Sequence, residues 1–176
     1  MPDTHRPTGP GAPATAFEGL KFVEQLALWS LRFWAESYRE DRRPYGQLDQ
    51  AYRLAGARDG MPALDGFMSV VLTGHSRPVD VHCLKCGGLS PDETRILAAL
   101  AACQRGRWDF AAEMIAAFLQ PASVRVGLSM IVAWGDCLAR AGHRLPLREV
   151  VDLAPLAAPP AGQDERAQAA APRLLH

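Results

Sequence analysis

The chain has 176 residues, of which 48% are hydrophobic, and its 19 Lys and Arg residues balance its 19 Asp and Glu residues. This length and apolar content suffice for one hydrophobic core and do not require a second domain. A net charge of zero offers no long-range attraction for polyanions, so we expect no general nucleic-acid binding and no attraction to an anionic membrane surface. Arginine and alanine are abundant and lysine is rare, a composition typical of GC-rich bacterial genomes.

The first residues are not typical of an export signal. Residues 1–15 contain four prolines and lack the apolar run of a secretory signal. The most apolar long stretch, Phe17 to Trp34, is interrupted by charged residues, whereas a spanning helix needs about 20 mostly uncharged ones. We therefore expect a cytoplasmic protein without a transmembrane segment, in which disordered tails, 1–15 and 155–176, flank one all-α domain, 16–154.

Apolar residues recur at helical spacing along most of that domain. The first predicted helix has an unusually broad apolar face, with Arg32 among the polar residues opposite, and Pro44 is expected to end it. A stretch rich in proline and glycine, 74–89, separates two groups of helices, and Val79 and Val81 alternate with polar neighbours there as in a short extended segment. The expected helices span residues 16–42, 47–57, 62–73, 90–106, 108–119 and 122–141, with a short turn at 147–153.

The sharpest helix boundary is predicted at Ser90-Pro91-Asp92-Glu93. This sequence is a capping box, in which Ser90 accepts from a free backbone amide and Glu93 reaches back to the Ser90 amide, with proline at the first helical position. Five to six helices joined by short connections, without a convincing pair of strands, indicate a single compact all-α domain with orthogonal or bundle-like packing.

One short motif suggests chemistry, the cysteine knuckle Cys83-Leu84-Lys85-Cys86-Gly87. Two thiolates two residues apart can bind one tetrahedral zinc ion, and the glycine lets the backbone turn beneath it. Zinc needs two more ligands, so a structural site must recruit them from His75, His82, Cys103 or Cys137, or from the same pair in a second subunit. The alternative is two reduced thiols in an ordered loop.

The four cysteines could also serve as disulfides, cluster ligands, haem attachment points or a redox dithiol. Four thiols in a reducing compartment favour free thiols or ligands over disulfides, and an iron–sulfur cluster would need all four. Haem attachment of the c type requires histidine directly after the second cysteine, where Gly87 stands. A thioredoxin-like dithiol requires a helix that starts at the first cysteine, which Gly87-Gly88 prevents. Cys103 and Cys137 are expected to be small buried residues on helix faces.

Two further features carry hypotheses. Asp136 lies on an apolar helix beside Trp134 and Cys137, where a buried carboxylate must be paired or neutralised. It is either the site of a small enzyme or one half of an ion pair; Arg95, Arg125 and Arg140 are its candidate partners.

The aromatic stripe of the first predicted helix is expected to lie mostly in the core and in part to serve a homodimer or a protein partner. Its residues are Trp29, Phe33 and Trp34.

The sequence favours a non-catalytic accessory, regulatory or interaction protein over an enzyme. A structural zinc at Cys83 and Cys86, completed by His75 or His82, is the site hypothesis that accompanies this interpretation. A redox or iron–sulfur protein that uses the same cysteines, and a small enzyme with a site near Asp136, are the alternatives.

Overall fold

The structure, a computed structural model, describes residues 17–148 and contains six helices in this part of the chain. The all-α prediction is confirmed: the β-pairing in the described residues is one isolated bridge between His75 and Leu119. The predicted tails, 1–15 and 155–176, and most of the turn at 147–153 lie outside the described residues. The helices are α1 (Phe22–Arg39), α2 (Tyr45–Leu54), α3 (Gly60–Gly74), α4 (Pro91–Cys103), α5 (Trp108–Ala116) and α6 (Pro121–Arg140).

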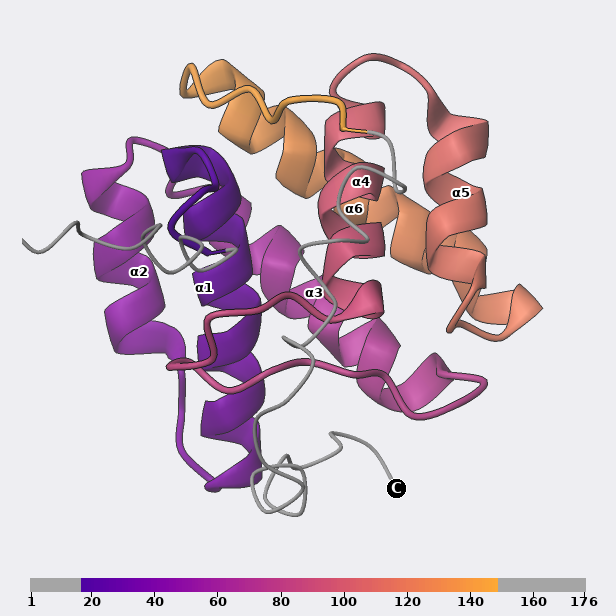
Figure 1. Cartoon of the computed structure of the whole chain (residues 1–176), viewed down its shortest axis with the longest axis horizontal. Helices are drawn as coiled ribbons and strands as arrows, with labels where there is room; N and C mark the ends of the chain where they lie inside the picture. Colours follow the sequence, from indigo (N-terminus) through magenta and orange to yellow (C-terminus); the bar gives the residue numbers. More distant parts are fainter. Residues whose placement is uncertain (1–16, 149–176) are drawn as a thin grey trace, which may run out of the picture.

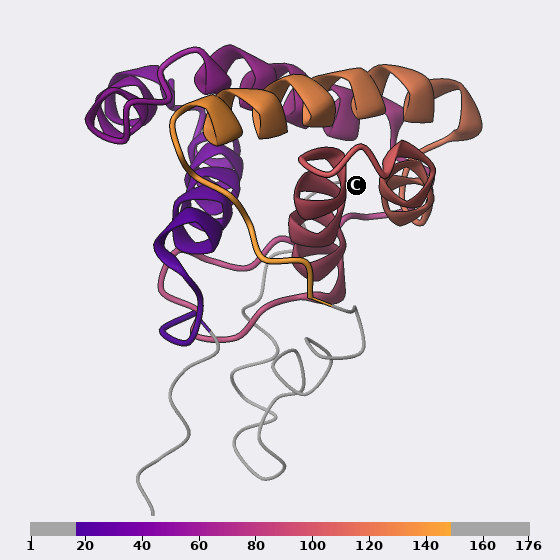
Figure 2. The same ribbon diagram turned by 90° about the horizontal axis from the view of Figure 1, so that it is seen from above.

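The helices pack crosswise in two layers. Figure 1 shows α1 and α2 on one side of the molecule and α4 and α5 on the other. In the view turned by 90°, α3 and α6 lie side by side along one edge of the molecule (Figure 2). Helices α1 and α4 both extend from the same side of this pair (Figure 2). The contact between α3 and α6 is the most extensive between any two helices. The packing is therefore the orthogonal kind that short connections allow.

One hydrophobic core joins all six helices, because each contributes an apolar stripe to it. Within α1, Ala27, Leu28 and Leu31 are fully buried. At the far side of the core, the indole Nε1 of Trp134 in α6 donates a hydrogen bond of 2.9 Å to the hydroxyl of Tyr52 in α2. Burial raises the pKa of Tyr52, against which the hydrogen bonds with Ser30 and Trp134 act more weakly. This hydroxyl thus stays neutral at every ordinary pH.

The first helix is shorter at both ends than the apolar pattern predicts. It begins at Phe22 because the Lys21 amide donates to the Glu24 carboxylate at 2.9 Å, which caps the first turn there. It ends at Arg39, before Pro44, since Asp41 adopts a left-handed conformation with φ of 51° and turns the chain. The polar residues that reverse the chain, and not the proline, set this boundary.

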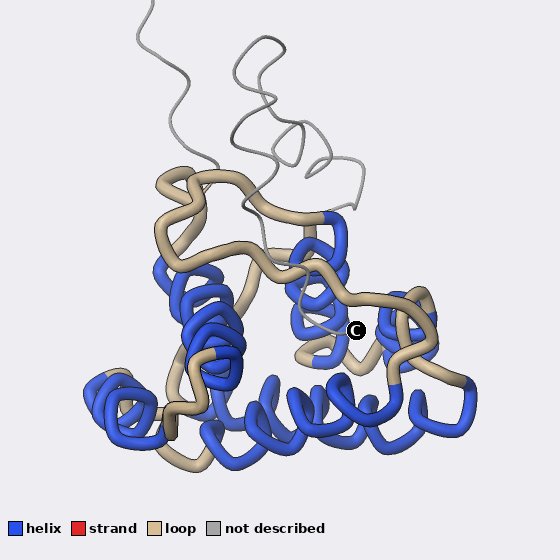
Figure 3. Tube along the Cα trace, turned by 90° about the horizontal axis from the view of Figure 1, so that it is seen from below, coloured by secondary structure: helices blue, strands red, loops and turns tan. Residues whose placement is uncertain are grey.

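A long connection, residues 75–90, joins α3 to α4 and is called the knuckle loop here. It crosses to α1 and returns to the start of α4, on the side of the molecule away from α3 and α6 (Figure 3). Val79 and Val81 are 1% and 2% exposed, so the alternation in this stretch marks side chains that enter the core. No strand forms in the knuckle loop. The backbone amides and carbonyls of the loop therefore bond to side chains or to single backbone groups outside any strand ladder.

The capping box at the start of α4 is confirmed. The Glu93 amide donates to Ser90 Oγ at 3.0 Å, and the Ser90 amide donates to Glu93 Oε2 at 2.8 Å. The same Ser90 hydroxyl donates to the carbonyl of Asp80, so it also fastens the knuckle loop to the helix.

We expect Ser90→Ala to lower the free energy of unfolding by about 1 to 2 kcal/mol, because the Glu93 amide loses its acceptor and the Asp80 carbonyl its donor. Chemical denaturation followed by circular dichroism measures this loss. Ser90→Thr, which keeps the hydroxyl, is the control and should lose less. Equal losses in the two variants would contradict the capping role.

By length and composition alone, α6 is the one helix within residues 17–148 that could cross a membrane, with a mean hydropathy of 1.3 over its most apolar window. Core helices of soluble proteins meet the same criterion. A buried stripe on α6, which includes Ile131, Trp134 and Leu138, packs in the core, and 28% of the window is buried. The absence of a membrane span therefore stays a prediction.

Candidate functional site

The two cysteines of the knuckle are joined in a disulfide, which differs from the thiols that the sequence predicts. Their Cα atoms lie 5.3 Å apart, within the range that a disulfide can bridge. The Cys86 amide donates to the Cys83 carbonyl at 3.1 Å, so a tight turn brings the side chains together. Both cysteines are partly exposed and Lys85 between them is exposed. The pair is therefore accessible to reagents in solution.

The side chain of Arg32 forms hydrogen bonds to the backbone of the knuckle. Its Nη1 donates to the Cys86 carbonyl and its Nη2 to the Gly88 carbonyl, both at 2.6 Å. The residue is 0% exposed, although the sequence placed it on the polar face of α1. That assignment is wrong because loop carbonyls and a carboxylate take the place of water around the guanidinium.

Glu93 completes the buried ion pair and binds the loop backbone as well. Its Oε1 accepts from Arg32 Nε at 2.7 Å and its Oε2 from Arg32 Nη2 at 2.9 Å. Oε1 also accepts from the His82 amide at 3.0 Å. With the Ser90 amide on Oε2, every lone-pair direction of this carboxylate is used. Such a network is costly to disturb, because each group depends on the others.

A second carboxylate, Asp92, fixes the first half of the knuckle loop. Arg77 donates to its two oxygens at 2.8 Å and 2.7 Å, and the Asp80 amide donates to it at 3.0 Å. Burial raises the pKa of Asp92, but the hydrogen bonds from Arg77 and the Asp80 amide outweigh it and leave the pKa below its ordinary value. The first turn of α4 thus presents two adjacent carboxylates that anchor two parts of the same loop.

The knuckle also touches the segment before α1. The Phe17 amide donates to the Gly87 carbonyl at 2.9 Å, and the Arg32 guanidinium lies 5.8 Å from the centre of the Phe17 ring. On the other flank, the Leu84 amide approaches Glu36 Oε2 at 3.4 Å. Residues from before α1, from α1 and from α4 therefore surround the cysteine pair.

The structure does not bring the predicted histidines into a cluster with the cysteines. His75 lies at the end of α3, where its Nδ1 is 3.2 Å from the carbonyls of Val71 and Leu72. His82 adjoins Cys83 in sequence, but its Nδ1 is 3.1 Å from the Gly88 carbonyl. Within residues 17–148, no three His, Cys, Asp or Glu residues are grouped so that they could hold a metal ion.

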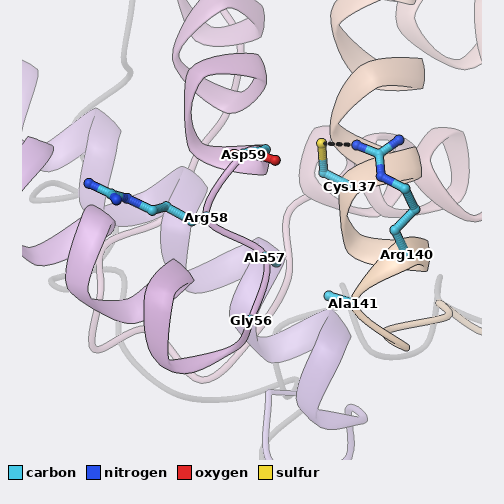
Figure 4. A pocket seen from close by; sticks show the side chains of 7 residues that line it. All are labelled: Gly56, Ala57, Arg58, Asp59, Cys137, Arg140 and Ala141. Carbon is cyan, nitrogen blue, oxygen red and sulfur yellow. Dashed lines mark hydrogen bonds between the residues drawn. The ribbon is translucent and has the colours of Figure 1, made fainter.

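The other two cysteines, Cys103 and Cys137, are free thiols. Cys103 is buried as expected, and burial together with the charge of Asp136 raises its pKa to about 12. Cys137, which was also expected to be buried, is only half-buried, because it borders a shallow hollow of about 200 Å³ between the α2–α3 connection and the end of α6. Figure 4 shows Arg140 pointing toward its sulfur, and Arg140 Nη2 donates to Sγ at 3.0 Å.

The expectation of a buried carboxylate at Asp136 is wrong, because this residue lies on the exposed face of α6. Two of its predicted partners bind elsewhere: Arg95 pairs with Asp92, and Arg140 bonds to Cys137. An enzyme site around Asp136 consequently loses the observation that motivated it.

The aromatic stripe is mostly core, as predicted. Phe33 and Trp34 are 9% and 7% exposed, whereas Trp29 is half-buried and stacks on Phe33 with ring centres 5.2 Å apart. Trp34 also lines a hollow of about 360 Å³ at the corner of α1 and α2, together with Tyr38 and Tyr45, which are about half exposed. Use of this stripe by a homodimer or a protein partner stays a prediction.

Comparison with known proteins adds no assignment: no family model, no curated protein and no solved structure matches the chain. The described residues define an all-helical protein that carries a partly exposed cysteine pair on a loop anchored by a buried ion pair. Its function is inferred from this site alone.

Proposed function

We propose that this chain is a non-catalytic regulatory or accessory protein in which Cys83 and Cys86 form a redox-responsive dithiol–disulfide pair. The single observation that carries the proposal is the disulfide itself. It lies in a partly exposed turn whose backbone is hydrogen-bonded to the side chain of Arg32. Exposed disulfides are the labile kind used in regulation or exchange, whereas structural disulfides resist reduction because their reduction potentials are low.

The magnitude of the stabilisation argues against a purely structural bond. A disulfide stabilises a fold mainly by closing a loop in the unfolded chain, and the effect grows with the length of that loop. This one spans a sequence separation of 3, for which the same relation gives about 2 kcal/mol at most. Arg32, Glu93 and Ser90 already fix the loop on both sides of the pair. The bond therefore adds less to the fold than a disulfide that closes a long loop, and we attribute its presence to reversible chemistry.

The reaction is thiol–disulfide exchange with an external dithiol. One thiolate of the dithiol attacks a knuckle sulfur, the S–S bond breaks, and the released knuckle sulfur takes up a proton. This step leaves a mixed disulfide between the reagent and the other knuckle cysteine. The second thiolate of the reagent then attacks the reagent's own sulfur in the mixed disulfide and closes the reagent's disulfide, and the second knuckle sulfur leaves as a thiolate and takes up a proton. Two electrons pass from the dithiol to the protein, which ends with thiols at Cys83 and Cys86.

The proposal predicts a single redox transition confined to these two residues. The protein is equilibrated in buffers of reduced and oxidised dithiothreitol, quenched with an alkylating reagent and analysed by mass spectrometry of its peptides. We expect labels at Cys83 and Cys86 to appear together as the buffer becomes more reducing, while Cys103 stays unlabelled in the folded protein because its pKa is about 12.

Cys83→Ser is the matched control: it should abolish the transition, leave Cys86 labelled in every buffer, and keep the helical circular dichroism of the wild type. Hydrogen exchange of residues 75–90 should be faster in the reduced protein. A pair that stays oxidised in excess reductant until the protein unfolds, or that never oxidises, would refute the proposal.

Zinc binding is the second candidate, favoured by the same accessible pair. Because no group of three ligands exists within the described residues, the ion would have to be shared with the equivalent pair of a second chain. Protein reduced without oxygen and dialysed against buffered zinc would then contain about half an ion per chain and would be dimeric. In this assay the redox proposal alone expects no bound zinc, no change of oligomeric state on addition of zinc, and reactive thiols at Cys83 and Cys86.

A further inference from the structure

The geometry points to Arg32 as the positioning residue that sets the redox equilibrium of the Cys83–Cys86 pair. Its side chain holds the knuckle backbone by hydrogen bonds to the carbonyls of Cys86 and Gly88. This inference rests on the proposed redox function and goes further, because it names the residue that determines how readily the pair is reduced.

The position of Arg32 makes it a rigid support. It extends from the middle of α1, is 0% exposed, and its guanidinium is fixed by two hydrogen bonds to Glu93. The remaining donors reach the carbonyl of Cys86 itself and that of Gly88, two residues further on. Only a planar fork with several donors can satisfy a carboxylate and two carbonyls at once, so lysine cannot replace it.

The effect on the equilibrium between dithiol and disulfide follows from the conformational entropy of these two forms. In the oxidised protein the S–S bond restricts the turn, and in the reduced protein only the anchoring contacts do so. Without Arg32 the dithiol form gains more conformational freedom than the disulfide form, since the disulfide still limits the latter. Loss of the anchor therefore shifts the equilibrium toward the dithiol. By linkage, the disulfide must strengthen the anchored loop by the same factor.

Charge does not explain the same effect. A cation near a cysteine stabilises its thiolate, but Arg32 is paired with Glu93 through two short hydrogen bonds. Arg32→Lys keeps the positive charge and removes the geometry of the fork. The variant thus separates positioning of the backbone from electrostatic stabilisation of thiolate.

The test is the equilibrium constant between the pair and dithiothreitol, measured on folded protein by alkylation and mass spectrometry. For Arg32→Lys we expect the constant for disulfide formation to fall about tenfold, which corresponds to a reduction potential higher by about 30 mV. The matched control is Arg39→Lys on the same helix: Arg39 is half-buried and donates to the Ala35 carbonyl, and among the described residues it has no hydrogen bond to the knuckle loop. Its equilibrium constant should stay within twofold of the wild type.

A second variant covers the case in which Arg32→Lys does not fold. Arg32→Met with Glu93→Gln removes both buried charges, and the side-chain amide oxygen that the second substitution introduces keeps an acceptor for one of the two loop amides that Glu93 binds. This double variant should show the same tenfold shift. A native circular dichroism spectrum with an unchanged equilibrium constant, in either variant, would overturn the inference while leaving the redox function intact. A wild-type pair that does not cycle would overturn both.

Discussion

Replacing Glu93 by alanine is expected to lower the free energy of unfolding by about 3 to 5 kcal/mol, which would consume a large part of the stability of a domain this size. The loss is large because Arg32, the buried partner of Glu93, stays in the core. Arg32 is 0% exposed, so the variant would retain a buried guanidinium without a counter-ion. The amides of His82 and Ser90 would lose their acceptor at the same time.

Chemical denaturation followed by far-ultraviolet circular dichroism measures this loss. Glu113→Ala is the matched control, because Glu113 lies on the exposed face of α5 and should leave the midpoint nearly unchanged. The double variant Arg32→Met with Glu93→Gln should be far more stable than Glu93→Ala, since removing both charges leaves no unpaired ion. A Glu93→Ala protein as stable as the control would show that the ion pair is not buried as described.

The helices were predictable from sequence because their signals are local. The capping box at Ser90 and Glu93 needs only residues three apart, and the structure has both of its hydrogen bonds. Apolar spacing likewise located all six helices. The ends of α1 were missed, since they depend on the Glu24 carboxylate and on the left-handed turn at Asp41, which compete with the apolar pattern.

The environment of the knuckle could not be predicted in the same way. Arg32 and Glu93 are 61 residues apart, and on a single helix Arg32 is indistinguishable from a solvated residue. One signal was present: Arg32 lies between Leu31 and Phe33 on a helix whose apolar face is unusually broad. Such a face can extend to the charged residue, which once buried requires a charged partner.

The cysteine motif was found but its neighbours were not. Spacing alone nominates Cys83 and Cys86, because a two-residue interval brings their side chains together in any tight turn. Which other groups approach is decided by long-range packing: Phe17, Arg32 and Glu36 all lie about 50 residues or more before the knuckle residues that they contact. His75 and His82 were nominated for nearness in sequence, and their rings instead lie beside backbone carbonyls.

A second large effect is expected in the core, where Trp134→Ala should lower the free energy of unfolding by about 3 to 5 kcal/mol. Trp134 is 0% exposed and is the largest fully buried side chain in the described residues. A cavity would open beside the contact between α6 and α3, the most extensive in the fold. Tyr52, also 0% exposed, would lose the indole donor of its hydroxyl.

Two matched variants test this account. Trp134→Phe keeps one six-membered aromatic ring but removes the five-membered ring and the hydrogen bond, so it leaves a smaller cavity and should lose less stability than Trp134→Ala. Trp108→Ala removes an indole that is 57% exposed at the start of α5 and should change stability little. The midpoints of chemical denaturation, followed by far-ultraviolet circular dichroism, provide the comparison. Equal losses for Trp134→Ala and Trp108→Ala would contradict the placement of Trp134 in the packed core, because only a packed interior distinguishes two tryptophans by the atoms that surround them.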